Sequence, residues 1–201
     1  MVASIFDVNK QLTFYGAYHS NKINVLIHIV CVPILLWTAF VLAAPIELPS
    51  FFPKYAIAIS PLLQFELNVT SITAAVYMAY YFILEPFAAA LYLPQMILSV
   101  LTATAFARGP GNISKAAVIH GLSWIAQFLG HGLAEKRAPA LLDNLLGAVV
   151  LAPFFVHLEL LFAVGYAPEQ HKRLQNEIGK EIAKIRKAQG DKKRAAAAKK
   201  N

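Results

Sequence analysis

Long apolar stretches separated by short polar turns make up most of the first 170 residues. A helix that crosses a bilayer needs about 20 predominantly apolar residues. Five stretches come near that length: Ile23–Ile46, Leu67–Leu84, Pro86–Ala107, Ala116–Ala134 and Leu145–Tyr166. The second of them is the weakest, because it is the shortest and begins with polar residues. The pattern predicts an all-α, polytopic membrane helix bundle with about four to five membrane segments.

The pattern changes after residue 170 to a polar helix rich in lysine and alanine. Residues 171–201 contain eleven Lys or Arg against three Asp or Glu, an excess of eight positive charges in a chain of net charge +7. We therefore expect a membrane-embedded domain, residues 1–170, and a basic, cytosolic tail, residues 171–201. Five full crossings would put the N-terminus on the side of the membrane opposite the cytosolic tail. If both termini are cytosolic, only four of the segments cross the membrane fully. No aromatic residue is interleaved with the cations to stack on bases, which favours membrane lipids over nucleic acid.

Histidines inside the apolar stretches are the first candidates for chemistry. There are four of them: His28, His120, His131 and His157. Ionisable residues are costly in a membrane and face the interior of a helix bundle, and neutral histidine is the commonest metal ligand. For any single histidine the alternative is a hydrogen bond between two helices.

Helical spacing separates these histidines into groups. His120, Gln127, His131 and Glu135 share one face of a continuous helix, and the last two can reach one metal ion or each other. His120 lies about 16 Å from His131 along that axis, so the two cannot share one ion. We expect a structural role for His120, with support of a metal ligand as the alternative. His19 and His28 would point apart in one straight helix. A break at Ser20–Asn21, with Asn21 capping the second helix, would let them converge.

The inventory of motifs excludes several classes of enzyme. Clustered histidine boxes of the HxxxH and HxxHH type do not occur, which argues against a di-iron site and favours a mononuclear site. GxSxG, Walker A, GxGxxG and CxxC motifs are also absent, so nucleophilic-serine, nucleotide and dinucleotide chemistry have no support. Lys136 and Arg137 follow Glu135 directly. They could anchor the membrane end or bind the carboxylate of an amphiphile.

Two segments carry a resemblance to a known family. FYGAYHSNKINVLIHIVCVPIL (residues 14–35) and WIAQFLGHGLAEKRAPALLDNLLGAVVLAPFFVHLELLF (residues 124–162) resemble the fungal endoplasmic-reticulum 2-hydroxy fatty acid dioxygenases, a small membrane family also found in bacteria. The marks are YH…N…H and QFxGHxxxE…PAL…DN…APFF, and the resemblance covers roughly residues 12–165. It implies a multi-pass protein of the endoplasmic-reticulum membrane. It also implies an iron(II)-dependent enzyme that uses O₂ to shorten 2-hydroxy fatty acids by one carbon in phytosphingosine degradation.

The same resemblance suggests the site residues. His19, His28 and His131 match the histidines of the family motifs, and Glu135 belongs to the second motif. We expect these three histidines to hold Fe(II), with Glu135 as a fourth ligand or as a residue that orients the ligands. Substrate contacts are expected from Gln127, Lys136 and Arg137. Two other classes stay open at this point: a non-enzymatic lipid-binding or scaffold protein, and a metal-dependent membrane hydrolase.

Overall fold

Helices account for most of the chain. The computed structural model describes residues 5–136 and 147–198. Its helical elements follow in chain order: α2 (Val8–Tyr18), α3 (Lys22–Ala43), α4 (Val69–Leu84), α5 (Pro86–Ala107), α6 (Asn112–Leu129), the π-helices η1 (Gly130–Glu135) and η3 (Gly147–Leu151), α7 (Ala152–Ala163) and α8 (Pro168–Ala198). Strands β1 (Ala56–Ser60) and β2 (Leu63–Glu66) form an antiparallel hairpin. The predicted helical class is therefore confirmed in outline, and the expectation of an all-α chain missed this hairpin.

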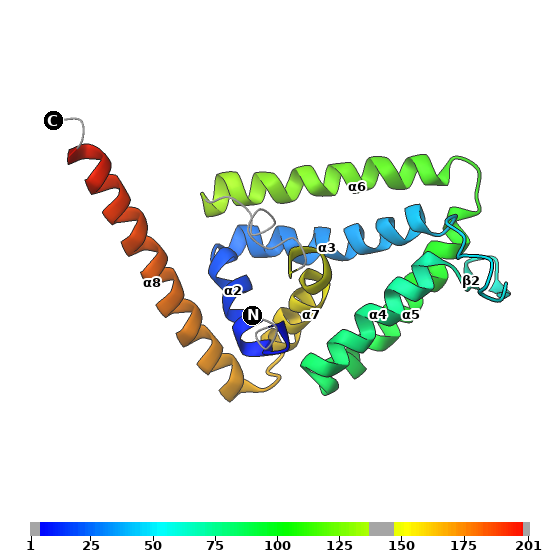
Figure 1. Cartoon of the computed structure of the whole chain (residues 1–201), viewed down its shortest axis with the longest axis horizontal. Helices are drawn as coiled ribbons and strands as arrows, with labels where there is room; N and C mark the ends of the chain where they lie inside the picture. The colour runs from blue at the N-terminus through cyan, green and yellow to red at the C-terminus, as the bar shows by residue number, and fades with distance from the viewer. Residues whose placement is uncertain (1–4, 137–146, 199–201) are drawn as a thin grey trace.

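Two helix pairs diverge from the hairpin. Figure 1 shows α3 and α6 side by side, α4 and α5 as a second pair, α7 against α3, and α2 leading into the start of α3. The long helix α8 runs past α2 at the end of the molecule opposite the hairpin. The first turns of α3 and the end of α6 meet at that same end. Residues far apart in the sequence are thus brought together there.

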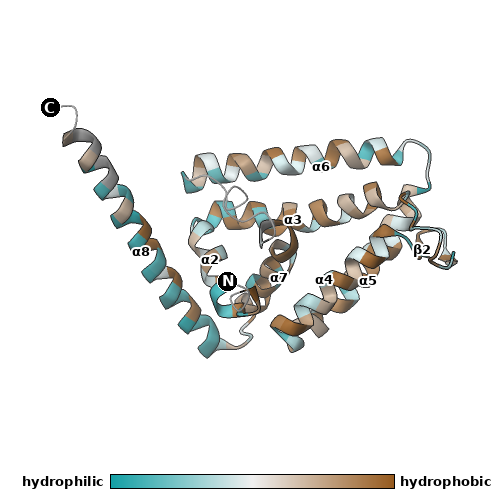
Figure 2. Cartoon of the chain, in the orientation of Figure 1, coloured by the Kyte–Doolittle hydropathy of each residue, from teal (hydrophilic) through white to brown (hydrophobic). Residues whose placement is uncertain are grey.

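Two of the described helices are long and apolar enough to cross a membrane, α3 and α5. The number becomes three if Val149–Ala163 and Pro168–Asp191, which meet at a bend of 119°, form one broken span. The apolar helix α4 is shorter. Figure 2 shows brown, hydrophobic residues along α3 and α5 and mostly teal, hydrophilic residues along α8. The predicted total of four to five membrane segments stays a prediction.

The helix ends follow local sequence signals. Asn21 caps α3 as expected, because its side chain accepts a hydrogen bond from the backbone N–H of Ile23. Asn68 and Ser71 form a capping box at the start of α4. At the start of α5 the Glu85 side chain accepts from Ala88. Pro86–Ala107 has the bounds that the hydrophobic pattern predicted.

Aromatic side chains fill the core between α4, α5 and α7. Tyr81, Tyr92 and Phe154 are almost completely buried. The rings of Tyr81 and Phe154 stack with centroids 4.5 Å apart, and the Tyr81 hydroxyl donates to the carbonyl of Val150. Burial of such side chains stabilises a fold by about 1.5–3 kcal/mol each in water. This core holds α7 in place, and α7 in turn supports α2 because Tyr15 packs on Phe155 with ring centroids 4.8 Å apart.

Candidate metal centre

The turn between α2 and α3 brings the first two histidines together. Helix α2 ends at Tyr18, His19 follows as its C-cap, and α3 begins at Lys22. The predicted break at Ser20–Asn21 is therefore confirmed. Because the chain reverses here, the ring of His19 lies 4.4 Å, centroid to centroid, from the ring of His28 in α3.

A π-helix supplies the third histidine. At Gly130 the α-helix α6 gives way to η1, whose wider turns rotate the side chains relative to an α-helix. Gly130 lies against α3: a Cβ atom there would be 2.7 Å from Oδ1 of Asn24. His131, the next residue, places its ring 4.9 Å from the rings of both His19 and His28. Single turns of π-helix are frequent at functional sites.

Three candidate ligand nitrogens, one from each of these histidines, lie within 4.8 Å of one another. His28 and His131 are each only 4% exposed. Nδ1 of His19 lies 2.7 Å from the carbonyl of Tyr15, and Nδ1 of His28 lies 2.9 Å from the carbonyl of Asn24. A carbonyl oxygen only accepts, so Nδ1 carries the proton in both rings and Nε2 keeps its lone pair. Metal-binding histidines are commonly oriented in this way.

The charge state also suits a metal. Burial, together with the neighbouring His28, holds the pKa of His19 well below its ordinary value and outweighs the opposing hydrogen bond to Tyr15. The imidazole of His19 is therefore neutral near pH 7. Only the neutral ring can offer a lone pair to a metal ion.

Glu135 ties the end of η1 to the turn between α2 and α3. Its carboxylate accepts hydrogen bonds from the backbone N–H and the hydroxyl of Ser20, from the N–H of Asn21 and from the side chain of Asn24. Burial alone would raise the pKa of Glu135, but these hydrogen bonds outweigh it and lower the pKa, so the group is ionised. Within the described residues, the cluster of candidate ligand atoms contains the three histidines alone. The contacts fit the orienting role better than the role of a fourth ligand.

The three residues expected to contact the substrate differ in burial, and the structure describes two of them. Gln127 is 7% exposed and lies four residues before His131 on α6. Among the described residues its Nε2 has no hydrogen-bond partner, so a buried donor is available near the histidines. Lys136 is exposed and ends η1 in the left-handed conformation, with φ of 54°. Arg137 lies outside the described residues.

The remaining histidines have other partners. Trp124 donates to Nε2 of His120 at 3.0 Å, so the proton of His120 is on Nδ1, 2.8 Å from the hydroxyl of Thr38. Both ring nitrogens are thereby used, and His120 links α6 to α3 as a structural residue. His157 places Nε2 3.1 Å from the carbonyl of Ala88 and joins α7 to α5. His120 and His157 therefore take the alternative role given above for a single histidine, a hydrogen bond between two helices.

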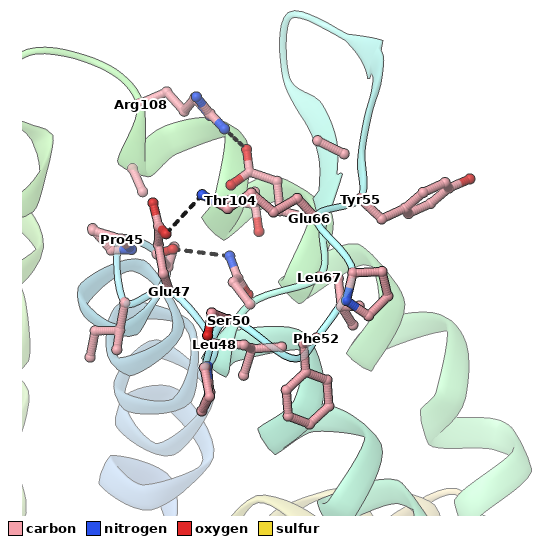
Figure 3. A pocket seen from close by; sticks show the side chains of 18 residues that line it. Pro45, Glu47, Leu48, Ser50, Phe52, Tyr55, Glu66, Leu67, Thr104 and Arg108 are labelled. Carbon is pink, nitrogen blue, oxygen red and sulfur yellow. Dashed lines mark hydrogen bonds and ion pairs between the residues drawn. The ribbon is translucent and has the colours of Figure 1, made fainter.

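A cavity of about 760 Å³ lies away from the histidines, between the loop after α3, the hairpin and the end of α5 (Figure 3). Glu66 and Arg108 form an ion pair at its edge. Ala44, the C-cap of α3, lines this cavity and lies sixteen positions after His28, which is about 24 Å along the helix axis. This cavity is therefore not part of the histidine cluster.

Residues 5–164 match a protein family that is described as 2-hydroxy-palmitic acid dioxygenase Mpo1-like. The chain belongs to the Mpo1-like family. The 2-hydroxy-palmitic acid dioxygenase MPO1 of Saccharomyces cerevisiae is 29% identical to it over 184 residues, which cover 89% of this chain and 93% of the yeast protein. No solved structure matches. The Mpo1-like match spans all three clustered histidines and ends before α8, and the family resemblance predicted from the two motifs is confirmed.

Proposed function

We propose that this chain is an iron(II)-dependent dioxygenase that shortens 2-hydroxy fatty acids by one carbon. The observation that carries the proposal is the cluster of His19, His28 and His131, buried where α2, α3 and η1 meet. The family supports it, since the yeast relative is a 2-hydroxy-palmitic acid dioxygenase by name.

The donor set fits a redox-active first-row metal. Three neutral imidazoles suit iron, zinc, copper or nickel, and three protein ligands leave coordination positions open on an octahedral ion. The choice of iron rests on the need to react with O₂. Bound iron(II) would supply that reactivity and positions for the hydroxyl and carboxylate oxygens of the substrate. The chain itself orients His19 and His28 through two backbone carbonyls.

The proposed reaction is balanced without a further reductant. A 2-hydroxy acid and one O₂ give the acid shorter by one carbon, carbon dioxide and water. The four electrons lost by the organic substrate are the four that O₂ accepts. No nicotinamide, flavin or second organic substrate is needed, which agrees with a sequence that lacks a dinucleotide motif.

The polar groups beside the histidines fit an anionic amphiphile. Gln127 offers a buried N–H donor that can bind the substrate hydroxyl or carboxylate. Lys136 supplies positive charge at the end of η1, and Arg137 follows it in the sequence. These two cations would bind the carboxylate of a membrane-dissolved fatty acid. The acyl chain would extend along the apolar helices. We place the protein in the endoplasmic-reticulum membrane, as a multi-pass enzyme of phytosphingosine degradation.

A single assay tests the proposal against its two rivals. Purified protein in lipid nanodiscs is incubated with 2-hydroxypalmitate, with and without O₂ and with and without added Fe(II), while bound iron, O₂ uptake and substrate loss are measured. The proposal expects one iron per chain and turnover only with O₂. Turnover without O₂ would indicate the metal-dependent hydrolase, and no stoichiometric metal and no turnover would indicate the lipid-binding or scaffold protein.

Variants locate the site in the same assay. His131→Ala is expected to lose iron and activity, whereas His120→Ala, which removes a histidine outside the cluster, is expected to retain iron. Full iron content and full activity in the His131→Ala protein would refute the assignment of the triad.

A further inference from the structure

The C-terminal helix α8 packs against the short helix that carries His19. Within the described residues, α2 and α8 are in extensive contact, and Leu174 and Ile178 of α8 are buried at 5% and 8% exposure. Ile182 packs against the same apolar cluster. The match to the Mpo1-like family ends at residue 164, before this helix begins. The sequence alone indicated a basic tail here.

A glycine makes the close approach of α8 possible. A Cβ atom placed on Gly16 would lie 2.3 Å from Cδ1 and 2.8 Å from Cγ1 of Ile178. Separations below 3.0 Å do not occur for Cβ atoms in well-packed structures. Ile178 therefore occupies the space that any larger residue at position 16 would need. A Cβ atom placed on Gly179, the residue after Ile178 in α8, would meet no atom within 4 Å.

Helix α2 depends on neighbours on both sides. Its eleven residues are too few for a stable isolated helix, because helices shorter than about 12–15 residues are marginal in water. On one side Tyr15 packs on Phe155 of α7. On the other side Gly16 receives Ile178 of α8. Removing the second support leaves α2 with its contact to α7 and with the hydrogen bonds of Glu135 to the turn that follows α2.

The position of α2 is transmitted directly to His19. The carbonyl of Tyr15 accepts the hydrogen bond from Nδ1 of His19. The Tyr15 ring also stacks on the His19 ring with centroids 3.9 Å apart and planes 19° apart. His28 lies on α3 and His131 on η1, and these two elements contact each other without α2. His19 is thus the ligand that responds when α2 shifts.

We propose that α8 is a brace that positions His19 through the contact of Ile178 with Gly16. The helix is then a working part of the metal centre, and the boundary at residue 170 does not separate a domain from a dispensable tail. The metal readout of this inference rests on the proposed metal site. Loss of a supporting interaction typically weakens metal affinity by about 10–100-fold, and that is the effect expected when the contact is disrupted.

Complementary substitutions test the contact. Gly16→Val adds three carbon atoms at the interface, and Ile178→Ala removes three, so the double variant restores the packed volume approximately. Gly179→Val is the matched control, because it introduces the same residue on α8 where space is open. Co(II) serves as the probe of the site, since its visible absorption reports both affinity and the number of nitrogen ligands.

Gly16→Val is expected to weaken Co(II) binding by about 10–100-fold and to alter the Co(II) spectrum. The double variant should return to within about threefold of wild type by volume compensation, and Gly179→Val should match wild type. Wild-type Co(II) affinity in Gly16→Val, or no recovery in the double variant, would overturn the inference.

A second measurement is independent of the metal. Hydrogen exchange of the α2 backbone amides in the metal-free protein should be faster in Gly16→Val and recover in the double variant. Unchanged exchange in Gly16→Val overturns the brace. If wild-type protein binds no Co(II), the proposed metal site fails, and the exchange data still decide whether α8 holds α2.

Discussion

Replacement of Glu135 by glutamine separates the two roles that the sequence left open for this residue. One carboxylate oxygen accepts from the N–H and hydroxyl of Ser20, and the other accepts from Asn21 and, at 3.4 Å, from Asn24. In Glu135→Gln an NH₂ group replaces one of these oxygens and faces donors. The hydroxyl of Ser20 can rotate to accept, but its backbone N–H cannot.

The magnitude follows from this count. At least one charge-assisted hydrogen bond is lost, and the remaining ones now go to a neutral acceptor. Hydrogen bonds to charged groups contribute about 1.5–3 kcal/mol each, and the partial exposure of Glu135 reduces that figure. We expect the metal-free protein to lose about 2 kcal/mol of unfolding free energy. Denaturant titration in mixed micelles, with Ser20→Ala as a smaller loss at the same contact, measures it.

Metal binding provides the decisive comparison. If Glu135 orients the turn that carries His19, Glu135→Gln lowers the stability of the metal-free protein and weakens Co(II) affinity by about 10–100-fold with an unchanged ligand set. If Glu135 were itself a ligand, Glu135→Gln would also change the Co(II) spectrum, because a carboxylate oxygen would leave the ligand set. A double variant with Ser20→Ala should show strong coupling in stability, because the two residues share one contact. Additive effects would refute the reasoning.

Three further predictions concern the surroundings of the triad. His120→Ala should cost about 1–3 kcal/mol of stability, since it removes the hydrogen bonds that join His120 to Thr38 on α3 and to Trp124 on α6. Bound iron measured by mass spectrometry should nevertheless stay at the wild-type level. Gly130→Ala should lower the thermal midpoint and metal affinity, because its Cβ would meet Asn24 at 2.7 Å, whereas Gly132→Ala, in open space, should have no such effect. Removal of the metal with a chelator should lower the thermal midpoint of unfolding. Fe(II) added at 100 times its dissociation constant should restore about 2.7 kcal/mol of unfolding free energy. Equal midpoints with and without metal would contradict a site that forms only in the folded chain.

Helix positions could be predicted because the relevant signals are local. An uncharged apolar run that starts at Pro86 defines α5, and the preference of Asn21 for a cap position defines the start of α3. These signals were enough to predict the break that lets His19 and His28 converge. The hairpin between Ala56 and Glu66 was missed because its short apolar strands follow a proline-rich loop. Runs of that length do not distinguish a strand from irregular structure.

The contacts that complete the site depend on residues distant in sequence. The π-helix places His131 against α3, and its onset at Gly130 coincides with the close approach of Asn24. The hydrogen bonds from Ser20 to Glu135 join residues 115 positions apart, and the packing of Ile178 on Gly16 joins still more distant ones. No periodicity within one segment encodes such pairs. Sequence spacing therefore indicated which histidines to consider, and tertiary packing explains how they meet.

The origin of the three histidines has a consequence for folding. His28 and His131 lie on α3 and η1, which pack together, whereas His19 comes from a short helix outside that pair. A metal ion bound by all three would therefore join α2 to the α3–η1 unit, and the free energy of metal binding would add to the docking of α2. Because α8 acts on the same helix from the opposite side, the metal and α8 stabilise the same arrangement. Metal binding should then strengthen the packing of α8 on α2, and that packing should strengthen metal binding by the same factor, because linked equilibria are reciprocal.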